Sequence, residues 1–173
     1  MRVVKTLMLA AGVVLVTAVP AAAAPANGGN AGGWEPTSTP PFVIPAGQVC
    51  SFEVKGDIVA DHERMRTLAT FPDGSPQVQD FDGVLVIRYT NTANHRTIVR
   101  DATGTVRLYL QADGTKIWQF HGHNALPVKA SNTGFPGGDY IIRGDFVVID
   151  HPDHVRDIPV QLGTMENLCQ TLA

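Results

Sequence analysis

The chain has 173 residues and a formal net charge of −3 at pH 7, from 13 lysines and arginines against 16 aspartates and glutamates. No run of like charge occurs in it. A mildly acidic chain of this kind lacks the basic surface needed to bind nucleic acid or anionic lipid, so neither partner is expected.

The N-terminus has the layout of a secretory signal peptide over residues 1–23. A short basic start is followed by the uncharged apolar run of residues 6–19 and then by small residues at positions 21–24, the three-part pattern of an exported chain. The apolar run is shorter than the roughly 20 residues that span a bilayer. We therefore expect cleavage near Ala23, an extracellular location, and no membrane attachment once the signal is removed.

Residues 24–47 are rich in glycine, proline, alanine and small polar residues. A stretch of this composition buries too little apolar surface to order itself. We predict a flexible tether, with residues 42–44 docking where the folded domain begins.

Residues 48–173 show the alternation of apolar and polar side chains that is typical of strands with one buried face. Turn signals such as Pro72–Gly74 and Asp113–Gly114 separate the strands, and Gly144 is expected at a bulge. The predicted strands cover residues 48–61, 65–71, 84–90, 96–101, 105–110, 115–124, 139–150 and 157–162. Residues 164–172 are predicted to form a short helical turn.

About eight short strands at a spacing of about 8 to 12 residues, without an amphipathic helix, indicate an all-β domain. A folded part of about 125 residues is enough for one core and not for two. Strands this close in sequence pair as antiparallel neighbours. We predict a single small antiparallel β-barrel or sandwich, and the pattern leaves these two open.

The chain has two cysteines, Cys50 and Cys169. An even number of cysteines in an exported chain favours a disulfide. Their spacing excludes a CxxC redox motif, and two thiols alone make a poor zinc site. The predicted bridge would tie the start of the folded domain to its end.

The stretch WQFHGHN, from Trp118 to Asn124, comes closest to a chemical motif. On a strand, His121 and His123 share one face while Trp118 and Phe120 occupy the other. Burial of the aromatic rings is the more favourable choice, which places the histidines outside. Two imidazoles on one strand face can still chelate a divalent ion. If the faces were reversed, they would line a cavity suited to acid–base chemistry.

A second group of possible metal ligands lies in the sequence DHPDHVRD, which holds Asp150, His151 and His154. Nothing in the spacing shows that these side chains converge with one another or with His121 and His123. We expect no cofactor, with a divalent metal at either group as the alternative. The chain contains no nucleophile elbow, no HExxH motif and no phosphate-binding glycine loop.

Several segments of the chain together carry a resemblance to known proteins. They are Gly47–Val54, Leu85–Asn91, Asp101–Thr105, Gly122–Leu126, Gly138–Asp150 and Asn167–Ala173. This set, after a signal peptide and a Gly/Pro-rich tether, resembles a group of small secreted actinobacterial proteins of unassigned function. The resemblance implies an exported β-domain closed by a Cys50–Cys169 bridge, and it implies no reaction. The architecture is also loosely similar to eight-stranded barrels of the allene oxide cyclase and dirigent type, an analogy of fold alone.

Export, a disulfide, a tether and the lack of a catalytic motif favour a non-enzymatic binding or interaction domain with an extracellular ligand or protein as its partner. The alternative is a small-barrel enzyme of the isomerase, cyclase or hydrolase type. Such an enzyme would use histidines or carboxylates that face the inside of the barrel.

Overall fold

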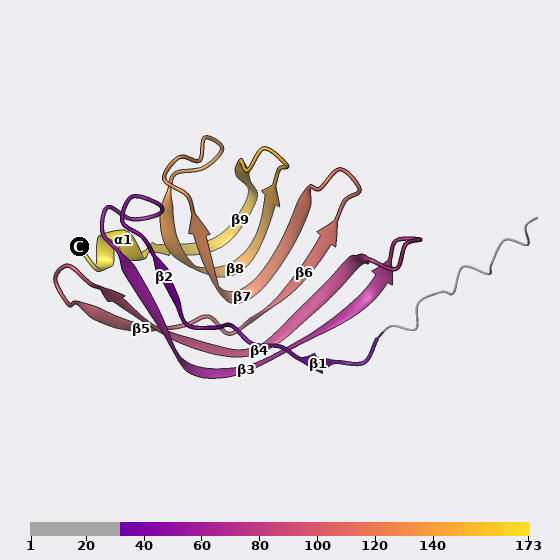
Figure 1. Cartoon of the computed structure of the whole chain (residues 1–173), viewed down its shortest axis with the longest axis horizontal. Coiled ribbons are helices and arrows are strands. Elements are labelled where there is room, and N and C mark those ends of the chain that lie inside the picture. Colours follow the sequence, from indigo (N-terminus) through magenta and orange to yellow (C-terminus); the bar gives the residue numbers. More distant parts are fainter. Residues whose placement is uncertain (1–31) are drawn as a thin grey trace, which may run out of the picture.

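A computed structural model describes residues 32–173. The predicted signal peptide and the first part of the predicted tether lie outside the described residues. The chain forms one antiparallel sheet of nine strands and one short helix (Figure 1). The elements are β1 Glu35–Pro36, β2 Phe42–Ile44, β3 Val54–Thr70, β4 Pro76–Asn91, β5 Thr97–Asp101, β6 Gly104–Leu110, β7 Lys116–Val128, β8 Gly138–Asp150, β9 Arg156–Asn167 and α1 Leu168–Thr171.

The all-β, antiparallel prediction and the C-terminal helical turn are confirmed. The main path of the sheet runs β1-β3-β4-β6-β7-β8-β9, with β2 beside β3 and β5 beside β4. The sheet is strongly curved (Figure 1), and within residues 32–173 no pairing joins β9 to β1, so it is not closed. No helix in this part of the chain is long and apolar enough to cross a bilayer.

The separation of residues 48–61 and 65–71 into two strands is wrong. From Val54 to Thr70 the chain is one 17-residue strand that pairs along the length of β4. The predicted gap at residues 62–64 is part of the strand, and there Arg64 donates from Nε to Asp82 of β4 at 3.1 Å. Cross-strand ion pairs suit a strand as well as apolar pairs do, so the alternation of hydropathy did not reveal that the strand continues.

The prediction of a flexible tether is also wrong for residues 32–47. Both β1 and β2 pair with the outer edge of β3, which satisfies backbone groups that a free edge would expose. The predicted docking of residues 42–44 is confirmed, because Phe42 packs edge-on against Tyr89 with 6.1 Å between ring centroids. The ring of Trp34 lies beside Arg64 and Arg66, at 4.6 and 4.5 Å from their guanidinium carbons.

A row of five glycines crosses the sheet at the point where the sheet divides into two layers, which is called the fork. The glycines are paired neighbour to neighbour on β4, β6, β7, β8 and β9: Gly83, Gly104, Gly122, Gly144 and Gly163. At Gly83, φ is +140°, and an added Cβ would collide with the backbone of His62 and Glu63. Gly144 is not a bulge as predicted, since the register shift of this strand pair lies between Val147 and Ile149.

β6 connects β4 to β7 only on one side of the glycine row, because β6 begins at Gly104. The β4–β6 pairing ends at Gly83, the β6–β7 pairing ends at Gly122, and β4 continues beside β5. The sheet therefore divides into two layers. One layer holds β3, the second half of β4, and β5, and the other holds the second half of β7 with β8 and β9.

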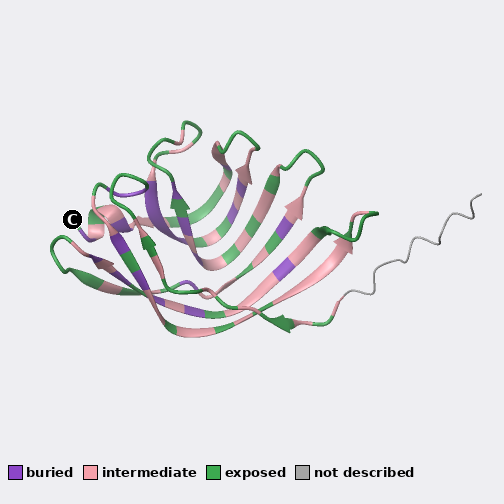
Figure 2. Ribbon diagram, in the orientation of Figure 1, coloured by how far each residue is buried: buried purple, intermediate pink, exposed green. Residues whose placement is uncertain are grey.

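The larger core lies between the two layers, and Figure 2 shows buried residues gathered at this end of the molecule. Its fully buried members come from all parts of the chain: Val54, Ile87, Tyr89, Ile141, Leu168 and Leu172. A second cluster covers the other face of β7 and β8 and includes Leu126, Ile142, Phe146 and Val148. Residues 138–142 of β8 are consequently buried on both faces.

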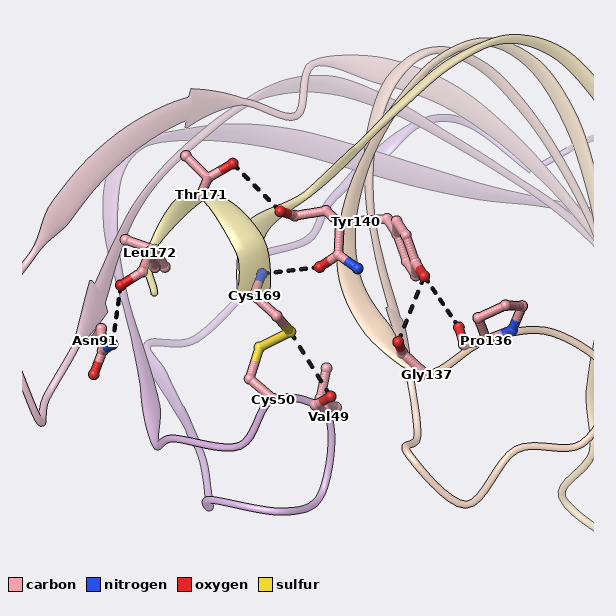
Figure 3. The surroundings of a disulfide bond; sticks show 10 residues. Val49, Cys50, Asn91, Pro136, Gly137, Tyr140, Cys169, Thr171 and Leu172 are labelled. Atoms are coloured by element: carbon pink, nitrogen blue, oxygen red, sulfur yellow. Dashed lines mark hydrogen bonds between the residues drawn. A yellow bond between two sulfur atoms is a disulfide. The ribbon is translucent and has the colours of Figure 1, made fainter.

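The predicted disulfide between Cys50 and Cys169 is present (Figure 3). It fixes α1 against the loop that precedes β3, and the two cysteines are separated by 119 residues in sequence. The side-chain amide of Asn91 donates to the carbonyl of Leu172 at 3.0 Å, which holds the last turn over the end of β4. The disulfide and this hydrogen bond close one end of the larger core, which lies between the two layers.

Replacement of both cysteines, Cys50→Ala/Cys169→Ala, should lower the free energy of unfolding by up to about 5 kcal/mol, because the unfolded chain regains the freedom that a long closed loop removes. Urea unfolding without reductant measures the loss. Reduction of the wild-type protein should produce the same loss, and unchanged stability in both experiments would contradict a stabilising bridge.

Gly163→Ala should destabilise the fold by about 1 to 3 kcal/mol, because the added Cβ would overlap the backbone carbonyl of Arg143 on β8. Gly33→Ala is the matched control, since a Cβ at that position meets no atom within 4 Å. Urea unfolding of both variants tests the glycine row, and equal stability of the two would contradict close backbone contact there.

Candidate functional site

A cavity of about 480 Å³ lies at the fork of the sheet. Its walls are mainly apolar and come from both layers. The undivided part of the sheet contributes Phe81, Val106, Trp118 and Phe120. Beyond the glycine row, one layer contributes Leu85, Ile87 and Tyr89 with the neighbouring Ala102, and the other contributes Asn124, Ala125, Pro127 and Asp139. The remaining lining residues are Thr39, Phe42, Ile44 and Glu63.

Asp139 is the buried acid of this cavity. It is the second residue of β8, its exposed fraction is 2%, and its Oδ2 atom has no hydrogen-bond partner. Burial raises the pKa of this carboxyl to about 7, because the charged form is poorly solvated among apolar neighbours. Asp139 is therefore poised between its neutral and charged forms near neutral pH.

Tyr89 supplies the second unsatisfied polar atom. It lies on β4, its exposed fraction is 0%, and its hydroxyl has no hydrogen-bond partner. Burial, and then the charge of Asp139, raise the pKa of this phenol well above its usual value, so it stays protonated. Among the buried side chains of residues 32–173, Asp139 and Tyr89 hold the two polar atoms that lack a partner, and both line the same cavity.

Asp139 was not among the candidate residues predicted from sequence. The signal that could have found it is a carboxylate beside the uninterrupted apolar run Tyr140–Ile142. A central strand buried on both faces reads as such a run, and a neighbouring acid is drawn inside with it. Asp139 begins the predicted strand 139–150, directly after Gly137 and Gly138, and residues next to a loop are usually near the surface.

His121 and His123 lie outside this cavity, on the face predicted for them. Trp118 and Phe120 face the cavity, and their rings are stacked at 6.2 Å. The side chain of His121 is 73% exposed and contacts Asp145 at 2.7 Å. The side chain of His123 is 38% exposed and contacts Asp101 at 3.2 Å. Each imidazole thus has a carboxylate partner of its own.

The structure does not bring Asp150, His151 and His154 together as a set of metal ligands. Asp150 is held by Arg156, at 2.8 Å from Nη2, and by the indole N–H of Trp118 at 2.9 Å. His151 contacts Asp157 at 3.0 Å. Across residues 32–173, no group of three or more histidine, cysteine or acidic side chains is placed to hold a metal ion.

Comparison of the chain with models of protein families, with curated proteins and with solved structures found no match. The cavity and its two polar groups are therefore the features from which a function is inferred.

Asp139→Asn should change how stability depends on pH. The folded state holds the Asp139 proton up to a pKa of about 7, against 3.8 for an ordinary aspartate, so the free energy of unfolding falls as pH rises from about 4 to about 7. The amide does not ionise. The variant should therefore gain up to about 4 kcal/mol relative to the wild type across this range.

Urea unfolding at several pH values between 4 and 8 measures the difference. Glu35→Gln is the control for loss of a negative charge, because Glu35 is exposed on β1 and outside the cavity. If the stability curves of Asp139→Asn and the wild type run parallel over this range, Asp139 does not titrate as a buried acid.

Proposed function

We propose that this domain is a secreted binding module that holds a small, largely apolar molecule with one polar group in the cavity at the fork of the sheet. The observation that carries the proposal is the pairing of apolar walls with two buried polar atoms, on Asp139 and Tyr89, that lack partners. The volume of about 480 Å³ is within the range of pockets for small molecules.

The unsatisfied groups define what the ligand offers. A buried polar atom without a partner costs about 1 to 3 kcal/mol, and a ligand that supplies the partner recovers that free energy. A neutral Asp139 both donates and accepts, and the hydroxyl of Tyr89 does the same. A carbonyl or hydroxyl on an otherwise apolar molecule matches both groups, while the remaining surface of the ligand contacts aromatic and aliphatic walls.

Export of the protein is part of the proposal. The signal-like pattern of residues 1–23 supports it, and so does the Cys50–Cys169 disulfide, because such bonds persist in oxidising compartments. The ligand is then an extracellular molecule.

The test uses N-phenyl-1-naphthylamine, a neutral apolar fluorophore that carries an amine. Trp118 lines the cavity, so the bound probe should accept excitation energy from it and show saturable fluorescence. Val106→Trp should weaken this binding at least about tenfold, because the larger side chain fills the cavity.

Val99→Trp is the matched control, since Val99 is 46% exposed and outside the cavity; it should bind the probe as the wild type does. Circular dichroism of both variants verifies that they fold. Absence of saturable binding to the wild type, or equal loss in both variants, would overturn the proposal.

A second candidate is proton-transfer catalysis of the isomerase, cyclase or hydrolase type. The observation that favours it is Asp139 itself, since a carboxyl with a pKa of about 7 in an apolar cavity can hold or accept a proton at neutral pH. The two functions differ in their need for Asp139. An amide in Asp139→Asn still offers hydrogen bonds to a bound molecule, whereas it cannot exchange the proton that catalysis requires.

A further inference from the structure

A second pocket of about 650 Å³, named the mouth, adjoins the cavity. Ile44 and Pro127 line both spaces. Several of the mouth's lining residues come from the loops that follow β6, β7 and β8, and these loops lie at the upper rim of the molecule in Figure 1. Its other lining residues are Gln48, Val49, Gly114, Lys116, Lys129, Asn132, Asp150, His151, Pro152, His154 and Arg156.

The curl of β7 brings two lysines to this mouth. Lys116 is the first residue of β7, and Lys129 directly follows its last residue. These positions would be far apart on a straight strand of 13 residues, at about 3.3 Å per residue. Arg156 holds the curled strand, since it donates to the carbonyl of Pro127 near one end and to Asp150, which pairs with Lys116 at the other.

The charge of the mouth is positive in a protein that is acidic overall. Asp150 is the one carboxylate among its lining residues, and Arg156 already neutralises it through two hydrogen bonds. Within residues 32–173, neither Lys116 nor Lys129 forms an ion pair. Both lysines therefore bring positive charge to the lining of the mouth.

We propose that the ligand is an amphipathic anion. Its apolar body fills the cavity at the fork, and its carboxylate, sulfate or phosphate group lies in the mouth between Lys116 and Lys129. This inference rests on the proposed function, because it assigns a charge to the same ligand. The hydrogen-bonding groups of Asp139 and Tyr89 meet the buried end, and the two ammonium groups attract the anionic end by complementary charge.

The test compares two probes that share one aromatic skeleton. 1-Anilinonaphthalene-8-sulfonate carries an anionic group, whereas N-phenyl-1-naphthylamine is neutral. Lys116→Ala/Lys129→Ala should weaken binding of the sulfonate probe by about threefold to tenfold, the effect of removing two partly solvated charge contacts, and leave binding of the neutral probe unchanged. For the wild type, raising NaCl from low to high concentration should weaken only the sulfonate probe.

Lys55→Ala/Arg88→Ala is the matched control. It removes two positive charges at exposed positions on β3 and β4 that do not line the mouth, and it should bind both probes as the wild type does. Equal weakening in this control would overturn the proposal, because the effect would then come from net charge.

The outcomes separate this inference from the function on which it rests. If the wild type binds the neutral probe and the lysine variant binds the sulfonate probe undiminished, the anionic group is refuted while the cavity stands as a binding site. If the wild type binds neither probe, both proposals fail.

Discussion

Close approach of backbones at the glycine row is the constraint on which the rest of this structure depends. Gly83, Gly104, Gly122, Gly144 and Gly163 lie side by side on five successive strands of the main path. A Cβ at several of these positions would meet neighbouring backbone atoms at distances that real side chains do not reach. Glycine alone lets the strands bend this tightly, and the bend lets one sheet divide into two layers that share a core.

Division of the sheet explains both the stability of the fold and the space within it. The C-terminal segment is pinned by the Cys50–Cys169 bridge, so Leu168 and Leu172 close the core far from the fork. At the fork itself the layers separate, and the space between them is only partly filled by Trp118 and Phe120. A buried polar atom without a partner costs free energy, so a cavity of this size with two such atoms in its walls is consistent with a site that a ligand completes.

The buried acid is the clearest chemical feature of the molecule. Asp139 lies on a strand covered on both faces, where the surrounding apolar atoms favour its neutral form. Such a carboxyl lowers the stability of the protein as pH rises from about 4 to about 7, and groups with strongly shifted pKa values cluster at functional sites. The adjoining pocket differs in character, because it is lined by Lys116 and Lys129, whereas the cavity has apolar walls with the hydrogen-bonding groups of Asp139 and Tyr89.

What the sequence by itself determined were properties that depend on near neighbours along the chain. The alternation of apolar and polar residues predicted most of the strands. It also placed the aromatic rings of Trp118 and Phe120 inside and His121 and His123 outside, because successive side chains on a strand point to opposite faces. The pairing of Cys50 with Cys169 followed from there being only two cysteines.

Only the tertiary structure decided which distant residues meet. The continuity of β3 depended on cross-strand ion pairs with β4, and the order of residues 32–47 depended on an open strand edge that composition does not reveal. The burial of Asp139 required a second layer over β8, and the meeting of Lys116 with Lys129 required the curl of β7. Whether five glycines far apart in sequence fall into one register is settled by strand pairing, which the local pattern of residues does not specify.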